Sequence, residues 1–116
     1  MIITIYHNPN WSKSCQSLEL LRETNAEVNV IEYIKNPPSV DDIALIVKKL
    51  NMNPQNFLRK SDKKYKELNL SEFNGSNEEL LRLMSDNPTI IERPIISSDT
   101  KAVIGRPPEN IFKLFQ

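Results

Sequence analysis

The chain is poor in the residues that build disulfides and metal centres: it has one cysteine and one histidine in 116 residues. A single cysteine cannot form an internal disulfide, and one His with one Cys falls short of the ligands that a zinc site needs. The sequence also lacks a secretion signal and any apolar run near the roughly 18 residues of a membrane span. We therefore expect a cytoplasmic protein with no bound metal and no membrane partner.

The sequence also has no excess of either positive or negative charge. Fifteen basic residues balance fifteen acidic ones, so no nucleic-acid partner is expected and any anion site must be local. With 39% hydrophobic and 26% charged residues, the composition is that of a folded globular protein. The length predicts a single domain over residues 1–116.

Apolar patterning predicts the order β-α-β-α-(α)-α-β-β-α along the chain. Short β-branched runs predict strands at 1–6 and 27–33, and the helix between them covers 12–24. A second helix begins at Ser39, with a stripe of Ile43, Ile46, Val47 and Leu50, and a third begins with the capping-box pattern at Ser76. The apolar runs over 90–104 predict a β-hairpin, and residues 107–115 a last helix with Ile111, Phe112, Leu114 and Phe115 on its buried side. Residues 51–75 predict one or two short helices.

The only histidine, tryptophan and cysteine lie within one segment, IYHNPNWSKSC. A loop from a strand into a helix favours anion binding, because the free N–H groups of the first turn point at the loop. Trp11 stands at that junction, and Cys15 follows one helical turn later on the same face. Cys15 is therefore a candidate nucleophile, although a lone cysteine among leucines is also typical of a small buried residue.

The remaining candidates are His7, which follows the first strand, and three arginines near apolar segments: Arg59, Arg93 and Arg106. His7 has the chemistry of a base, but a single histidine after a strand is also typical of a structural hydrogen-bonding residue. A planar cation near an apolar segment needs a partner or an oxyanion, whereas an ordinary surface arginine needs neither. Spacing alone does not bring the three arginines together. The proline after Arg93 permits a cis peptide bond.

Five segments resemble the glutaredoxin-coupled arsenate reductase (ArsC) family, in the family's order: ITIYHNP, NPPS, FLRK, NPTIIERPII and IGRPPENI. They extend from residue 3 to about residue 115. The resemblance implies an α/β, thioredoxin-like (glutaredoxin-like) fold, with a mixed four-stranded sheet, flanking helices and an inserted helical segment. It also implies an oxidoreductase whose substrate is arsenate or a similar small oxyanion.

The family's chemistry, carried over by resemblance, gives each candidate a role. A cysteine thiolate attacks arsenate, and glutathione and glutaredoxin then reduce the arsenylated cysteine and release arsenite, with no bound cofactor. His7 matches the histidine near the nucleophile, and Ser14 matches the hydroxyl that hydrogen-bonds the thiolate. Pro94 matches the fold's cis-proline. The oxyanion-binding arginines match Arg59, Arg93 and Arg106.

One position departs from the family pattern. Trp11 stands where the family has its catalytic cysteine, and Cys15 stands where many members have an arginine. Three hypotheses follow: a reductase that uses Cys15 as a displaced thiol, with Trp11 beside the substrate; a binding module that holds an oxyanion or a thiol without turnover; and an Spx-like regulatory role with RNA polymerase as partner.

Overall fold

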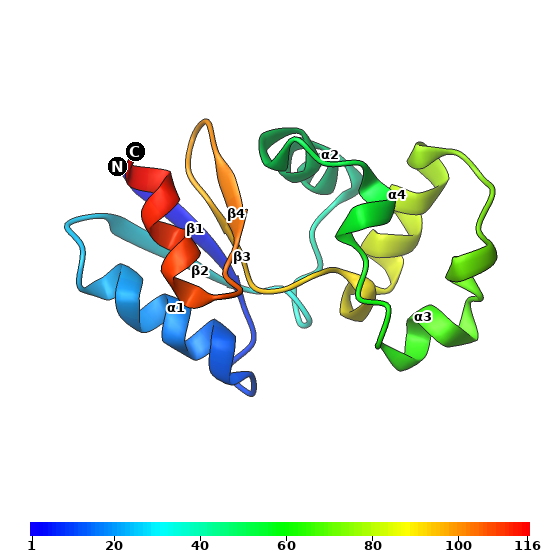
Figure 1. Ribbon diagram of the computed structural model, residues 1–116, viewed down its shortest axis with the longest axis horizontal. Helices are drawn as coiled ribbons and strands as arrows, with labels where there is room; N and C mark the ends of the chain where they lie inside the picture. The colour runs from blue at the N-terminus through cyan, green and yellow to red at the C-terminus, as the bar shows by residue number, and fades with distance from the viewer. The chain divides into compact units, whose positions relative to one another are not determined.

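The computed structural model describes all 116 residues, and the chain forms two compact units. The first unit consists of Met1–Asn36 and Arg93–Gln116, and the second is the segment between them, Pro37–Glu92 (Figure 1). Each unit is described by itself below. The single domain expected from the length stays a prediction.

The first unit contains a mixed four-stranded sheet, as the resemblance implies, with the strand order β2-β1-β3-β4. Its strands are β1 (Ile2–His7), β2 (Glu27–Glu32), β3 (Ile95–Ser97) and β4 (Ala102–Ile104). β1 pairs in parallel with β2 and antiparallel with β3, and β3 and β4 form the predicted hairpin. The parallel pair requires a crossover, which is α1 (Ser12–Arg22).

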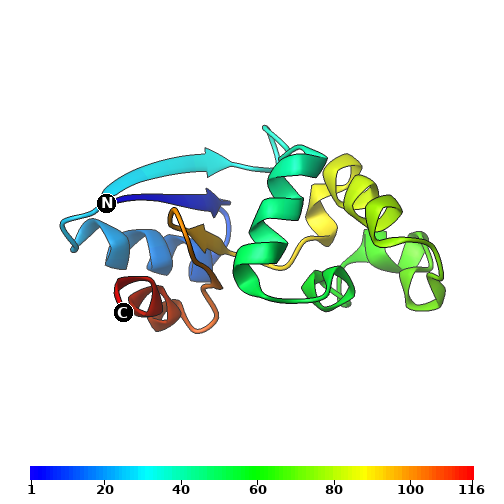
Figure 2. The ribbon, with the colours of Figure 1, turned by 90° about the horizontal axis from the view of Figure 1, so that it is seen from above.

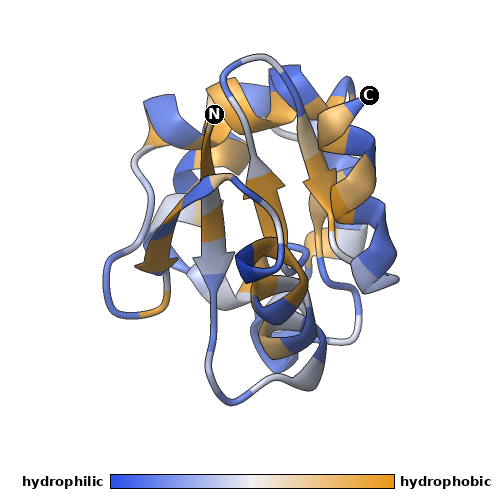
Figure 3. Cartoon of the chain, turned by 90° about the vertical axis from the view of Figure 1, so that its left-hand side faces the viewer, coloured by the Kyte–Doolittle hydropathy of each residue, from blue (hydrophilic) through white to orange (hydrophobic).

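Two helices cover one face of this sheet. Figure 2 shows α1 and the C-terminal 3-10 helix η4 (Pro108–Phe115) on the same side of the strands. Figure 3 shows apolar residues along the strands and polar ones on the outer sides of the helices. The core between these layers is made of Ile3, Ile5, Leu21, Ile96, Ile111 and Leu114, all nearly inaccessible to solvent. Its burial holds α1, and therefore the loop before it, against the sheet.

The second unit is helical, as the inserted segment was expected to be. It contains α2 (Val40–Leu50), α3 (Lys63–Glu67) and α4 (Asn77–Asp86), with short 3-10 helices η1 (Pro54–Phe57), η2 (Leu70–Glu72) and η3 (Pro88–Ile90). α2 begins with a complete capping box between Ser39 and Asp42. At α4 the Ser76 hydroxyl accepts from the Glu79 N–H, which is one half of such a box. The predicted stripe on α2 is confirmed, with Leu50 only half-buried.

The C-terminal helix corrects the sequence prediction. It is a 3-10 helix, whose three-residue repeat places Pro108, Ile111 and Leu114 on one buried edge. Phe112 and Phe115, predicted to be buried, are therefore 47% and 40% exposed.

The hairpin is also shorter than predicted, because Ile90 ends η3 and Ile91 forms an isolated bridge with Leu58 of the second unit. The Arg93–Pro94 bond is cis, as the resemblance implies, and the Arg106–Pro107 bond is cis as well. No helix combines the length and apolar character needed to cross a membrane.

Candidate functional site

The loop between β1 and α1 is closed by two of the predicted residues. His7 ends β1, and its Nδ1 lies 2.5 Å from the Oγ of Ser14, the third residue of α1. The same Oγ accepts a hydrogen bond of 3.0 Å from the Asn8 N–H. Ser14 is fully buried and His7 is 7% exposed. The structure therefore brings His7 and Ser14 together and fixes the start of the loop to the first turn of α1.

The environment of His7 favours its neutral form. Burial is the main cause that lowers the pKa of His7 below its usual 6.5. The Glu32 carboxylate opposes this by raising the pKa, and Arg22 adds to the lowering. Glu32 is the last residue of the neighbouring β2 and pairs in register with His7. The sequence did not identify this carboxylate, which only the parallel pairing of β1 with β2 places beside His7.

The lowered pKa of His7 predicts a pH-dependent stability. Below pH 6.5 the unfolded chain binds a proton at His7 that the folded chain does not, so the free energy of unfolding decreases as the pH falls. One proton limits this slope to about 1.4 kcal/mol per pH unit. Urea unfolding between pH 8 and pH 5 should show the decrease in the wild type and a flatter profile in His7→Gln. Parallel profiles would contradict the prediction.

Cys15 lies at the surface rather than in the core. The buried face of α1 consists of Ser14, Ser17 and Leu21, which repeat at helical spacing, and one residue of rotation carries Cys15 off that face. Its Sγ donates to the Pro9 carbonyl over 3.3 Å, so the thiol reaches back to the loop. The buried-cysteine alternative is therefore wrong. The misleading signal was the run of nearby leucines, because two serines occupy the buried face instead.

Trp11 is the N-cap residue of α1, and its side chain makes no capping hydrogen bond. The Arg93 guanidinium carbon lies 2.9 Å from the centre of the Trp11 ring, which is a cation–π contact. On the same unit the Tyr33 ring lies 6.0 Å from Trp11, centre to centre, at an angle of 56°. Trp11 and Arg93 thus come together, with an indole against the face of one predicted oxyanion-binding arginine. No pattern in the sequence indicated Tyr33 as their neighbour.

Arg59 lies in the second unit and has a carboxylate partner. Its backbone N–H donates to the Ile90 carbonyl over 2.8 Å, which fixes the start of the side chain. Its Nη1 lies 3.4 Å from Oδ1 of Asp62, and the two side chains are only 15% and 16% exposed. An oxyanion at Arg59 must therefore share the guanidinium with Asp62. The i, i+3 spacing of this pair is the local signal in the sequence that indicates the contact.

Arg106 follows β4 in the first unit and is exposed. The Asn110 side chain donates to the backbone carbonyls of Arg106 and Ile104 over 3.2 and 2.9 Å, which holds this turn. Arg93 and Arg106 thus share a unit with Cys15, and Arg59 belongs to the other. No group of three or more His, Cys, Asp or Glu side chains in the chain is arranged to hold a metal ion.

A pocket of about 270 Å³ opens along the same loop in the first unit. Its lining includes His7, Pro9, Glu32 and Lys35. Pro9 therefore both lines the pocket and accepts the hydrogen bond from the Cys15 thiol. The site offers one exposed thiol, a neutral imidazole and a cation covered by an aromatic ring.

Both the sequence and the fold of this chain are similar to those of known proteins. A sequence model of the ArsC family matches residues 6–114. The chain is 41% identical over 110 residues to a protein of Neisseria meningitidis named arsenate reductase, covering 94% of each chain. It is also 41% identical over 113 residues to YfgD of Escherichia coli K12, covering 97% of this chain and 95% of YfgD. The solved structure of arsenate reductase from Vibrio cholerae is 37% identical, with a TM-score of 0.92 over 97% of both chains.

Proposed function

The chain belongs to the ArsC family of arsenate reductase-like proteins, and from this premise we propose that it is a thiol oxidoreductase in which Cys15 reacts with arsenate or a similar oxyanion. The observation that carries the proposal is the position of the chain's only thiol. Cys15 is exposed and reaches back to the loop before α1, where its Sγ lies 3.3 Å from the Pro9 carbonyl. Trp11 has no sulfur and cannot supply the nucleophile.

The proposed reaction transfers two electrons from external thiols to arsenic. The Cys15 sulfur displaces one oxygen of arsenate as water and forms a sulfur–arsenic bond. Glutathione displaces a second oxygen as water, and a further thiol, from glutaredoxin or another glutathione, then attacks the glutathione sulfur. That disulfide leaves, arsenic keeps the electron pair as As(III), and water releases arsenite and the free Cys15 thiol.

The neighbouring residues support this reaction in distinct ways. Arg93 and Arg106 supply the positive charge that an oxyanion needs in the first unit, and the part of Arg59 rests on the resemblance to the family alone. Ser14 is a positioning residue, because its hydroxyl joins His7 to the loop through the Asn8 N–H. The Cys15 thiol can no longer donate to the Pro9 carbonyl once it has bonded to arsenic, so the reaction must break this hydrogen bond.

Replacing Cys15 with serine tests the proposal. Arsenate reduction coupled to glutathione and glutaredoxin should fall to the rate without protein, because serine cannot form the sulfur–arsenic bond. Gln16→Ser is the matched control, since Gln16 is the next exposed residue on α1, and it should keep the wild-type rate. Equal rates for wild type and Cys15→Ser would exclude Cys15 as the reacting thiol.

A binding module without turnover is the second candidate, and the Trp11–Arg93 contact favours it. The Trp11 ring lies over one face of the Arg93 guanidinium, whose planar fork of N–H donors has the geometry that binds an oxyanion. Binding there should change the fluorescence of Trp11, the only tryptophan. The Spx-like role with RNA polymerase stays a hypothesis that rests on the resemblance.

Fluorescence titration of Trp11 with arsenate, phosphate, sulfate and glutathione measures such binding. We expect at least one oxyanion to bind, and Arg93→Ala to weaken it about tenfold or more because a charge-assisted hydrogen bond is lost. Arg82→Ala, an exposed arginine of the second unit, should bind as the wild type does. Binding without Cys15-dependent turnover would favour the module over the reductase, and no binding of any of the four would exclude the module.

A further inference from the structure

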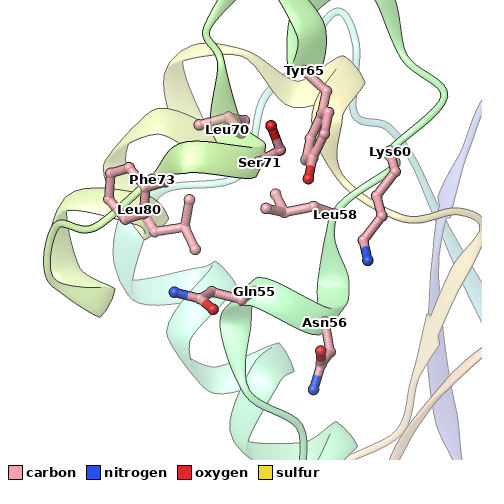
Figure 4. A pocket seen from close by; sticks show the side chains of 9 residues that line it. All are labelled: Gln55, Asn56, Leu58, Lys60, Tyr65, Leu70, Ser71, Phe73 and Leu80. Carbon is pink, nitrogen blue, oxygen red and sulfur yellow. The ribbon is translucent and has the colours of Figure 1, made fainter.

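The loop between η2 and α4 in the second unit contains the chain's only Asn-Gly sequence, Asn74–Gly75. Both residues are exposed and lie outside any helix or strand. The segment is held on either side, because the side chains of Phe73 and Leu80 line one pocket of this unit (Figure 4). Asn74 and Gly75 are not part of that lining. The dipeptide therefore meets water on a loop whose ends are anchored.

An asparagine followed by glycine can react with its own backbone. The nitrogen of the next residue attacks the side-chain carbon Cγ, and ammonia leaves, which closes a five-membered succinimide ring. Glycine favours this step, because it has no Cβ to block the approach and its backbone reaches conformations that other residues rarely adopt. The reaction needs an N–H at the next residue and a side-chain amide that is free to turn.

Asn74 and Gly75 meet both conditions. Neither the Asn74 side-chain amide nor the Gly75 N–H makes a hydrogen bond in the structure. The other asparagines of the chain are less suited to the reaction. Four of them precede proline, which has no N–H, and every remaining one is followed by a residue with a Cβ. Asn74 is therefore the one position where the sequence and the structure both permit the ring to close.

A carboxylate lies against the glycine. A Cβ on Gly75 would lie 2.6 Å from Oε2 of Glu79, the third residue of α4. The Cα atom that would bear this Cβ also carries the attacking nitrogen. Glu79 is exposed and makes no ion pair, so its carboxylate oxygens are open to accept a proton. Glu79 is thus placed to act as the general base for the Gly75 N–H.

We propose that Asn74 is a modification site, which deamidates by attack of the Gly75 nitrogen with Glu79 as the base. The bond from Gly75 N to Asn74 Cγ forms, the bond from Cγ to Nδ2 breaks, and the NH₂ group leaves as ammonia with the proton that Glu79 took up. Water then opens the succinimide at either carbonyl, which gives aspartate or isoaspartate at position 74. No electrons are transferred, and water is the only co-reactant.

Both products change the segment that leads into α4. Each adds a negative charge before the helix N-terminus, and isoaspartate also adds one carbon to the backbone between Asn74 and Gly75. The N-cap residue Ser76 follows directly, and its Oγ accepts a hydrogen bond of 3.1 Å from the Glu79 N–H. We therefore expect the modified protein to show shifted amide signals at Ser76 and Glu79.

Tryptic mass spectrometry of the full-length protein, incubated at pH 8 and compared with freshly purified protein, tests the proposal. One tryptic peptide, residues 67–82, contains Asn69, Asn74 and Asn77, so two asparagines are internal controls. The mass gain of an OH group in place of NH₂ should accumulate at position 74 and not at the other two. Isoaspartate and aspartate forms of the peptide should separate on reversed-phase chromatography.

Two variants separate the glycine from the base. Gly75→Ala should slow the reaction about tenfold or more, because the Cβ hinders the approach of the nitrogen to Cγ. Glu79→Gln should slow it severalfold, because an amide does not take up the proton. Glu78→Gln is the matched control, since Glu78 is the adjacent exposed carboxylate of α4, and it should react at the wild-type rate.

The site is overturned if position 74 gains mass no faster than Asn69 and Asn77 do. Equal rates for Glu79→Gln and Glu78→Gln would overturn the assignment of Glu79 as the base. Neither result bears on the Cys15 chemistry, because arsenate reduction by Asn74→Ser is expected to equal that of the wild type. The two proposals therefore stand or fall separately.

Discussion

Trp11→Cys is expected to raise the rate of glutathione- and glutaredoxin-coupled arsenate reduction about a hundredfold above the wild type. Position 11 is the N-cap of α1, where a thiolate faces the free N–H groups and the positive end of the helix dipole. Cys15 lies one turn further, and its own backbone N–H donates to the Trp11 carbonyl over 3.0 Å. The substitution therefore moves the sulfur to the point where the helix favours negative charge.

Removing the indole has a second effect that must be separated from the new thiol. Trp11 covers the face of the Arg93 guanidinium, so any small residue at position 11 opens that cation to substrate. Trp11→Ala measures this contribution, and we expect it to change the rate only severalfold. The double variant Trp11→Cys/Cys15→Ser should keep the high rate if the new thiol acts alone.

The outcome distinguishes two explanations for the departure from the family pattern. A fast Trp11→Cys variant shows that the remainder of the site is competent and that only the sulfur was displaced. A variant no faster than Trp11→Ala would contradict the prediction. It would mean that Arg93 and Arg106 do not hold the oxyanion beside position 11.

The fold was largely predictable because each element carries a local signal. The β-branched runs, the capping residues at Ser39 and Ser76 and the turn between β3 and β4 each act within a few residues. The exception is the C-terminal helix. Its sequence fits a repeat of 3.6 residues as well as one of 3.0, and only packing of Ile111 and Leu114 on the sheet selects the second.

The site was less predictable, because its contacts join residues far apart in sequence. The motifs that resemble the family indicated His7 and Ser14, and these lie together. No local sequence pattern predicts the contact between the Arg93 guanidinium and Trp11. This contact depends on how the chain returns to the sheet after the inserted helical segment. The exposure of Cys15 likewise depends on which face of α1 meets the sheet.

Gly105→Ala is expected to lower the free energy of unfolding by about 2 kcal/mol, because the added methyl group would overpack a closed space. A Cβ at this position would lie 2.5 Å from Ser17 Oγ and 2.9 Å from side-chain carbons of Ile96 and Pro94. Ile96 and Ser17 are fully buried, so neither can move into solvent. Gly105 does not have a positive φ, so the cost is one of space and not of backbone conformation.

Gly75 provides the matched control, because it is the only other glycine of the chain. A Cβ there would meet Glu79 Oε2 at 2.6 Å and Phe73 ring carbons at 2.7 and 3.0 Å. These are the ends of side chains that are exposed or half-buried, and they can rotate away. Urea unfolding should therefore show little change for Gly75→Ala. Equal losses at the two glycines would contradict the packing argument.

Ser17 makes the Gly105 prediction sharper. Its buried hydroxyl has no hydrogen-bond partner, so Ser17→Ala alone should not destabilise the protein and should even stabilise it slightly. The double variant Ser17→Ala/Gly105→Ala lacks Ser17 Oγ, which is the atom nearest to the new methyl group. In the Ser17→Ala background, Gly105→Ala should therefore lower the free energy of unfolding by less than it does in the wild type. The two changes must therefore be non-additive, and additive free energies would show that Ser17 does not limit the space at Gly105. Ser17 is on α1, so any shift that relieves the overpacking also moves the helix that carries Cys15. Gly105→Ala should therefore lower the rate of arsenate reduction. The double variant should recover part of that rate.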